Sequence, residues 1–394
     1  MKKHILIAPM LAIAATTVAS AQVASDVWTF EVNDEQALTA TVTGLEEASG
    51  TVVAIPETAV IDGKTYTVSA VNLYWYNTTE GPAAAVERVV VPKTVTEIEY
   101  LTCSPSVASF AVEFAEGSRL ATIGRAAFSH NAAMRSIELP PTVTEIGMDA
   151  FNQCGLERIA VPEGVTRIEN STFNRCPLVE AVLPDGVTYI GNSAFCQCPL
   201  AFFDFPEELK SIGSYAFEQA QLAEVVLPGK VSSVGEFAFA DCPITKLQLS
   251  DSLKVLRRGA FARTQIKEVV IPEGVETLEA DVFSRCPLEK IFFLPTGVVD
   301  MSLSFSSPFP YMYGATVYLP EGAADSDLYS SWTSHFGTVE LLSDEEMGVM
   351  LGIGGVAADG QRPGAPYYTL GGVKVGEPLR PGLYISRGKK VLVK

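Results

Sequence analysis

Basic and histidine side chains are scarce in this chain of 394 residues, and each scarcity argues against a class of function. Lys and Arg number 28 against 46 Asp and Glu, for a formal net charge of −18. The basic surface that attracts nucleic acid is therefore missing, and we expect no nucleic-acid partner. Of three histidines, two follow the first 21 residues, His130 and His335. So few leave little scope for a Ser-His-Asp or Cys-His arrangement, and we expect no catalytic residues and no enzyme activity.

Long hydrophobic runs are missing after residue 21. Lys2 and Lys3 precede an apolar stretch that ends in the small residues Ala19-Ser20-Ala21, a pattern typical of a secretory signal peptide. No later segment approaches the 18 or more apolar residues of a membrane span. We therefore predict an exported protein, extracellular or on the outer-membrane surface, with no transmembrane segment.

The dominant feature present is an internal repeat of 22 residues, with the general form L-x-x-I-x-L-P-x-x-V-x-x-I-G-x-x-A-F-x-x-C-P. Each copy has two short extended pieces, the first of them ended by the proline. One copy cannot bury its apolar face alone, whereas stacked coils can, with strands about 4.8 Å apart. The fold class predicted is a β-rich repeat solenoid. Its phenylalanines are Phe128, Phe151, Phe173, Phe195, Phe217, Phe239, Phe261 and Phe283.

The segment LERIAVPEGVTRIENSTFNRC, residues 156–176, resembles the BspA-like leucine-rich repeat of bacterial surface proteins. The resemblance covers about residues 86–295 and implies a leucine-rich-repeat solenoid with one strand-lined face. It also suggests adhesion, including adhesion to host matrix proteins. We expect a signal peptide at 1–21, an N-terminal cap or atypical repeats at 22–85, and repeats at 86–295. A C-terminal capping repeat at 296–342, a linker at 343–366 and a β tail at 367–394 complete the division.

The two ends of the solenoid need caps, because an uncovered end is an unpaired strand edge. We expect the segment around Asp62-Gly63-Lys64 to form a hairpin in the N-terminal cap, and Trp332 and Phe336 to cover the last coil. The tail, YYTLGGVKVGEPLRPGLYISRGKKVLVK, is predicted to form three short strands. It resembles the C-terminal sorting tail of the type IX secretion system of Bacteroidota. Whether it is a cleaved signal stays open.

A column of cysteines lies three residues after the repeat phenylalanines. Zinc requires four ligands around one point, whereas residues in a straight ladder are separated by about one strand spacing. Ala220, Thr264 and Asn131 take the same place in other coils, a substitution that a metal or redox set would not tolerate. We therefore predict small buried side chains, no metal and no cofactor, and interpret GIGGVA (352–357) as linker. The column is Cys154, Cys176, Cys198, Cys242 and Cys286.

The residues that flank the buried position of the first strand are predicted to point outward. Along one column the charge signs alternate from Glu224 onward, which indicates pairing between strands. Five apolar positions, Val182, Phe202, Val226, Val270 and Phe292, are predicted to form an exposed strip that binds a ligand. The alternative is that β-branched residues occur there because strands favour them. The candidate face is Arg158, Glu180, Val182, Phe202, Asp204, Glu224, Val226, Lys246, Gln248, Glu268, Val270, Lys290 and Phe292.

We interpret the protein as a secreted or cell-surface, non-enzymatic binding protein of the adhesin-like kind. Its repeat face is expected to contact an extracellular protein or glycan of a host or neighbouring cell. The alternative is a structural spacer or coat component with no specific ligand. A hydrolase would need a polar pocket rich in acids or histidine, and the sequence offers no such cluster.

Overall fold

A computed structural model of the chain describes most of the repeats and part of each end. The described residues are 27–48, 50–75, 86–103, 110–295, 299–300, 307–310, 312–321, 336–343, 346–347, 351, 367–369, 374–375, 382–386 and 389–393. The predicted signal peptide, Trp332 and His335 lie outside this set.

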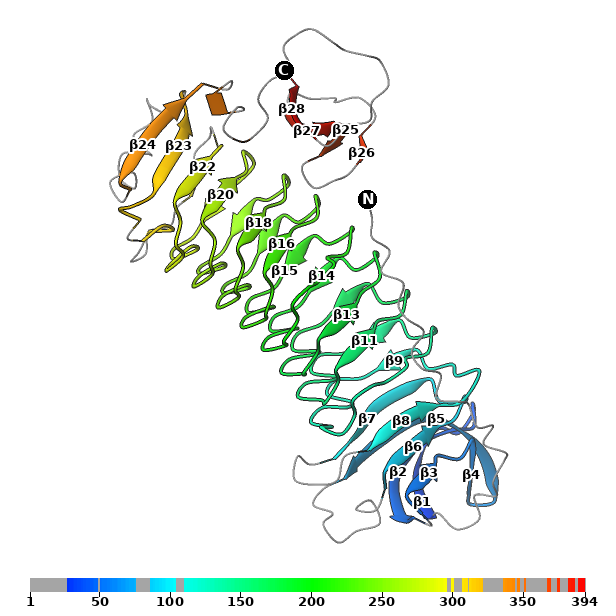
Figure 1. Ribbon diagram of the computed structural model, residues 1–394. Coiled ribbons are helices and arrows are strands. Elements are labelled where there is room, and N and C mark those ends of the chain that lie inside the picture. Colours follow the sequence, from blue (N-terminus) through cyan, green and yellow to red (C-terminus); the bar gives the residue numbers. More distant parts are fainter. Residues whose placement is uncertain are drawn as a thin grey trace.

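Parallel strands stacked coil upon coil form a β-solenoid, so the predicted fold class is confirmed (Figure 1). Each coil contributes to two faces. The first extended piece of the repeat forms one face and the second forms the other, and the apolar side chains between them make one continuous core.

The N-terminal end begins with an antiparallel hairpin that leads into parallel pairing. Strands β1 and β2 pair antiparallel, and β2 then pairs parallel with β5. The predicted hairpin at Asp62 and Gly63 is confirmed, since both have positive φ (49° and 77°) and join the antiparallel strands β4 and β5. The bounds are β1 (Val27–Asp34), β2 (Thr39–Glu47), β4 (Thr58–Ile61), β5 (Lys64–Trp75) and β7 (Glu97–Cys103).

The face made by the second repeat piece consists of two-residue strands in parallel register. The strands belong to two sheets, because β9 and β10 extend the sheet that contains β7, and the strands from β12 to β21 form a second sheet. These strands are β9 (Thr122–Ile123), β10 (Glu145–Ile146), β12 (Arg167–Ile168), β14 (Tyr189–Ile190), β15 (Ser211–Ile212), β17 (Ser233–Val234), β19 (Val255–Leu256) and β21 (Thr277–Leu278).

The face made by the first repeat piece is called the outer face below. It contains longer strands grouped in four sheets, β3-β6-β8, β11-β13, β16-β18 and β20-β22-β23-β24, all of them parallel. Its strands are β3 (Val52–Ala54), β6 (Arg88–Val91), β8 (Ala111–Phe114), β11 (Arg158–Ala160), β13 (Glu180–Val182), β16 (Glu224–Val226), β18 (Lys246–Gln248), β20 (Glu268–Ile271), β22 (Lys290–Phe293), β23 (Thr316–Pro320) and β24 (Thr338–Leu342).

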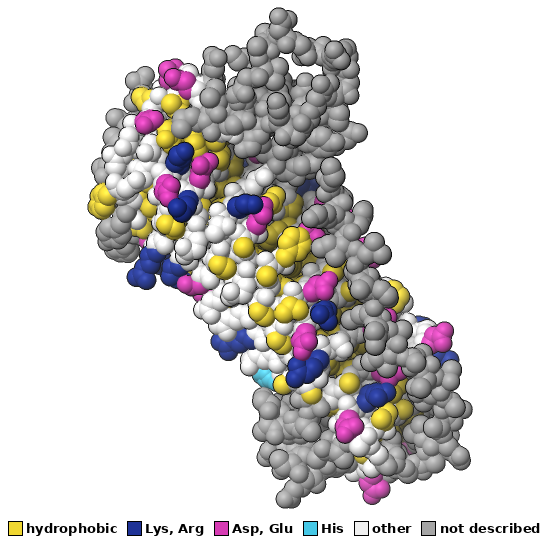
Figure 2. Space-filling view, viewed as in Figure 1, with side chains coloured by type: hydrophobic (Ala, Val, Ile, Leu, Met, Phe, Trp, Pro, Cys, Tyr) yellow, Lys and Arg dark blue, Asp and Glu magenta, His cyan; other side chains and the backbone are white. Residues whose placement is uncertain are grey.

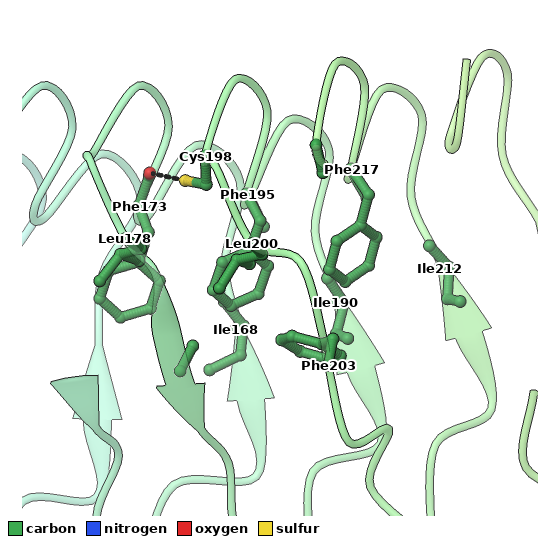
Figure 3. Close-up of a cluster of buried hydrophobic side chains, with 14 of the residues drawn as sticks. Ile168, Phe173, Leu178, Ile190, Phe195, Cys198, Leu200, Phe203, Ile212 and Phe217 are labelled. Carbon is green, nitrogen blue, oxygen red and sulfur yellow. Dashed lines mark hydrogen bonds between the residues drawn. The ribbon is translucent and has the colours of Figure 1, made fainter. Parts of the chain in front are cut away.

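The repeat phenylalanines stack on one another along the core. From Phe128 to Phe283, neighbouring ring centroids lie 5.2–5.8 Å apart with interplanar angles of 20° or less. Leucine and isoleucine side chains of both faces surround the rings, as Figure 3 shows for Phe173, Phe195 and Phe217. Burial of these large side chains supplies much of the driving force for folding.

The turns around each phenylalanine use left-handed backbone at two positions. The residues two before and two after the ring have positive φ in successive coils, for example Ser193 (54°) and Gln197 (59°) around Phe195. Gly191 precedes this turn where two coils approach closely. A Cβ there would lie 2.6 Å from the backbone nitrogen of Asn170, so only glycine fits without a shift.

The phenylalanine stack extends beyond the eight rings found in the sequence. Phe309 stacks on Phe283 at 5.5 Å and 9°, and Phe336 lies 5.6 Å from Phe309 at a tilt of 59°. Phe336 is buried, as expected of a residue that covers the last coil.

The tail has four described strands, one more than predicted from the sequence. They form an antiparallel sheet in the order β26-β25-β27-β28. The additional strand is short and contains a lysine, so the search for apolar runs did not find it. The strands are β25 (Tyr367–Thr369), β26 (Lys374–Val375), β27 (Gly382–Ser386) and β28 (Lys389–Val393).

Candidate functional site

The cysteine column is buried in the turns and bonded to the coil before it. Each thiol donates to the carbonyl oxygen of a phenylalanine in the preceding coil, as Cys198 does to Phe173 at 3.1 Å (Figure 3). The same bond is made by Cys154, Cys176, Cys242 and Cys286, at 2.8–3.1 Å. The prediction of small buried side chains is confirmed, whereas this hydrogen bond was not predicted.

Other residues in this column serve the same turn. Thr264 donates its hydroxyl to the carbonyl of Phe261 at 3.0 Å and lies 3.1 Å from the Cys286 sulfur. The Asn131 amide donates to the carbonyl of Phe110 at 2.8 Å. The position therefore accepts a short side chain that can be buried in the turn, whether or not that side chain has a hydrogen-bond donor.

Burial makes these thiols poor nucleophiles. Desolvation raises the pKa of Cys176 and of Cys242 to about 12. Cys196, outside the column, is also buried, and desolvation together with the nearby Glu218 raises its pKa to about 11. At neutral pH these sulfurs stay protonated, whereas nucleophilic attack and metal binding need the thiolate.

Within the described residues, no three His, Cys, Asp or Glu side chains are grouped so as to hold a metal ion. His130 occupies the second left-handed position of its turn, with φ of 65°. It therefore has the place that glutamine, arginine or aspartate takes in later coils.

The outer face presents two columns of exposed side chains on either side of a buried central residue. In β13 the pattern is clear, because Ala181 is buried while Glu180 and Val182 are exposed. Of the predicted apolar strip, Phe202 is 61% exposed and Val182 and Val226 are 41% and 42% exposed. Figure 2 shows hydrophobic side chains in a patchy band along the repeats, interrupted by charged side chains of both signs. Arg158, Asp204, Glu224, Lys246, Glu268 and Lys290 are also exposed, whereas Gln248 and Val270 are half-buried.

Charge pairing between neighbouring strands of the outer face is confirmed. Arg158 lies 3.4 Å from Glu180, and Lys246 lies 3.6 Å from Glu224. Glu268 and Lys290 are opposite each other in the register of β20 and β22. Because such exposed pairs contribute little to stability, they mainly cancel charge along the face.

Phe202 lies where the outer face is interrupted. Residues 202–204 form no strand, and the inward-pointing residue of this coil is Phe203, where other coils have Ile, Ala, Val or Leu. The Phe203 ring packs edge-on against Phe195 and Phe217, at 5.2 and 4.8 Å. Phe202 is thus presented beside a gap between two sheets.

The prediction that Phe292 belongs to an exposed strip was wrong. Its side chain is only 1% exposed, because it lies in a second hydrophobic cluster with Tyr318, Met347 and Leu351. Its ring stacks on that of Tyr318 at 4.8 Å and 14°. Half-buried Val270 also packs against this cluster.

The residues that cover Phe292 come from a helical turn in the segment that was expected to be a linker. Ser343 begins it, since its backbone N–H donates to the Glu346 carboxylate at 2.9 Å and the Glu346 backbone N–H donates back to the Ser343 hydroxyl at 3.3 Å. This reciprocal pairing is a capping box. The backbone N–H groups of Met347 and Leu351 each donate to a carbonyl four residues earlier. Two apolar side chains four residues apart therefore rest on the outer face.

These features correspond to a known protein family. A model of the BspA-type leucine-rich repeat region matches six copies within residues 104–222 and 188–302. The chain belongs to this family. BspA-type proteins are bacterial surface repeat proteins, which is consistent with a role in binding.

One solved structure supports the likeness of the fold, and a second is reported for its alignment alone. A leucine-rich repeat protein from Bacteroides ovatus aligns with a TM-score of 0.56 and 26% identity, over 81% of this chain and 76% of that one. A leucine-rich cell surface protein from Faecalibacterium prausnitzii aligns with a TM-score of 0.39 and 23% identity, over 82% and 96% of the two chains. No curated protein matches the chain. In the described part of this BspA-type protein, no helix is long and apolar enough to cross a membrane.

The buried thiols should make stability depend on alkaline pH. Unfolded thiols ionise near pH 9.0, while Cys242 in the folded chain stays protonated to about 12. Between these values the unfolded state loses a proton that the folded state keeps, so the free energy of unfolding falls as pH rises. At pH 10 the loss due to this thiol should be about 1 kcal/mol. Cys242→Ala, which copies the natural Ala220, should lose that much less between pH 7 and pH 10 in urea unfolding. Equal losses in the two proteins would contradict the assignment.

The contact between the covering turn and the outer face can be tested by placing charged side chains in that contact. Replacing both Met347 and Leu351 with Asp should detach it, because burial of each side chain contributes about 1.5–3 kcal/mol. We expect Phe292 and Tyr318 to become exposed and to increase the fluorescence of a bound hydrophobic dye severalfold. Leu341→Asp, at a residue of β24 that is 47% exposed, is the matched control and should leave dye fluorescence unchanged. An unaltered signal in the double variant would refute the cover.

Proposed function

We propose that this BspA-type protein is an exported, non-enzymatic binding protein that captures an extracellular protein through its outer face. The observation that carries the proposal is the column containing Val182, Val226, Val270, Phe292 and Tyr318. The strand registers place the last three side by side. One end of the column holds a segment of polypeptide, and the other end is exposed.

The occupied end indicates what the column accepts. Met347 and Leu351 cover Phe292 and Tyr318 with two apolar side chains one helical turn apart. A turn of helix rises about 5.4 Å, close to the strand spacing of about 4.8 Å. A helix laid across the strands therefore presents successive apolar residues to successive coils, a known mode of peptide recognition.

The exposed end offers apolar area without strong net charge. Phe202 and Val226 lie near the Lys246–Glu224 pair, in which the two charges offset each other. Aromatic side chains at the centre of an interface often dominate its affinity. These features favour a protein partner over a spacer with no ligand.

The test replaces both Phe202 and Val226 with Glu in the chain that follows the predicted signal peptide. Binding to an array of purified extracellular-matrix and cell-surface proteins is measured, with affinities by surface plasmon resonance. We expect at least a tenfold loss of affinity for any bound protein and little change in thermal unfolding, because surface substitutions usually change stability by less than about 0.5 kcal/mol. Val60→Glu is the matched control, since Val60 is 72% exposed but lies in the N-terminal hairpin. Binding that survives in the double variant would remove the outer face from the proposal.

We further propose that residues 367–394 direct the exported protein to the cell surface. Support comes from the resemblance of this segment to type IX sorting tails and from its antiparallel sheet. Deletion of 367–394 should trap the protein in the periplasm, as measured by fractionation and by surface labelling of intact cells. Normal surface delivery of the truncated chain would contradict this role.

A further inference from the structure

An exposed and a half-buried aromatic side chain stack at the corner between the two faces of the solenoid. Tyr215 and Phe237 occupy the same position of consecutive turns, two residues before the buried ring. Their ring centroids are 5.5 Å apart with an interplanar angle of 19°. Tyr215 is 37% exposed and Phe237 is half-buried. This pair is separate from the outer face.

The position is an unusual one for an aromatic residue. Both residues have left-handed backbone, with φ of 60° for Tyr215 and 51° for Phe237, a region that bulky side chains rarely adopt. Other coils place small or acidic residues there, and these are Ala126, Asp149, Ser171, Ser193, Gly259 and Asp281. Strained residues persist most often where they serve a function.

One end of the aromatic stack is closed. A Cβ at Gly259 would lie 2.3 Å from Cε1 of Phe237, so the ring fills the space beside that glycine. The Arg263 guanidinium lies 6.0 Å from the centre of the Phe237 ring. Its Nε donates to the Asp241 carboxylate at 2.7 Å, which holds the arginine in place.

At the other end of the stack, Tyr215 is 37% exposed and the neighbouring coils have short side chains. The preceding coils have Ser193 and Ser171 at this position, and a serine is too short to cover the face of Tyr215 one coil away. The side chains at this position in the two preceding coils therefore do not continue the aromatic stack beyond Tyr215.

Two asparagines at the preceding position of these turns are held by bonds to the next coil. The Asn192 side-chain oxygen accepts the backbone N–H of Ser214 at 2.8 Å, and the Asn170 side-chain oxygen accepts that of Asn192 at 2.8 Å. With each oxygen bonded to the next coil, each amide NH₂ group is available as a donor beside the serine hydroxyls.

We propose that this corner binds a sugar ring of a glycan, stacked on Tyr215 above Ser193. A pyranose with equatorial hydroxyls has a flat face of slightly positive C–H groups, which suits the electron-rich face of an aromatic ring. It also has a rim of hydroxyls, which suits the amide and serine groups. Its thickness is similar to that of the aromatic ring whose place in the stack it would take.

The test uses saturation-transfer NMR on the full mature chain, with methyl β-D-glucopyranoside and cellotetraose as probes. We expect saturation to reach the C–H protons of one sugar face. Tyr215→Ser should reduce the signal to background. The thermal midpoint should stay unchanged, because serine occupies the same position in two other coils.

The control is Phe202→Ser, on the outer face, which should leave sugar binding intact even if it abolishes protein binding. The proposal is overturned if neither probe receives saturation, if the signal survives in Tyr215→Ser, or if Phe202→Ser removes it. Loss of a matrix-protein interaction in Tyr215→Ser without any sugar signal would also overturn it, and would assign the corner to a protein contact.

Discussion

The stacking distance between coils is the constraint on which the rest of this structure depends. Strand pairing fixes the separation at about 4.8 Å, and the phenylalanine rings follow it with centroids 5.2–5.8 Å apart. Each coil must therefore place three residues at the same level along the stack. These are the repeat phenylalanine, the residue at the close approach between neighbouring coils, and the small residue of the cysteine column. Inward positions are restricted in size, while outward positions such as Glu180 and Val182 meet solvent and can vary.

The sequence was sufficient to predict what this spacing dictates. The 22-residue period identifies the solenoid, the buried cysteine column and the charge pairs of the outer face, because each is a contact between equivalent residues of neighbouring coils. Phe309 escaped detection because it lies 26 residues after Phe283 and so breaks the period. The ring still enters the stack, since the longer connection does not alter its height.

Contacts with segments outside the repeat could not be predicted in this way. The repeat period places Phe292 in a column of residues predicted to be exposed. Its side chain is buried because the turn that begins at Ser343 covers it. The signals for that turn were present in the sequence, namely Ser343 and Glu346 at the spacing of a capping box and Met347 and Leu351 four residues apart. Nothing in a single sequence specifies where such a turn will dock. The aromatic corner was missed for another reason, because the repeat pattern leaves the residue two before each ring unspecified.

If the outer face binds a ligand as proposed, the docked turn would act as a tethered competitor. Because it is joined to the solenoid by a short stretch of chain, its effective concentration at Phe292 and Tyr318 is on the order of millimolar. A free ligand for this end of the column must displace it, whereas a ligand for Val182 and Val226 meets no such competition. A ligand would thus need a higher affinity to occupy the covered end of the outer face than to occupy the exposed end. The apparent selectivity of the face would depend on the length of the connection as well as on the residues in contact.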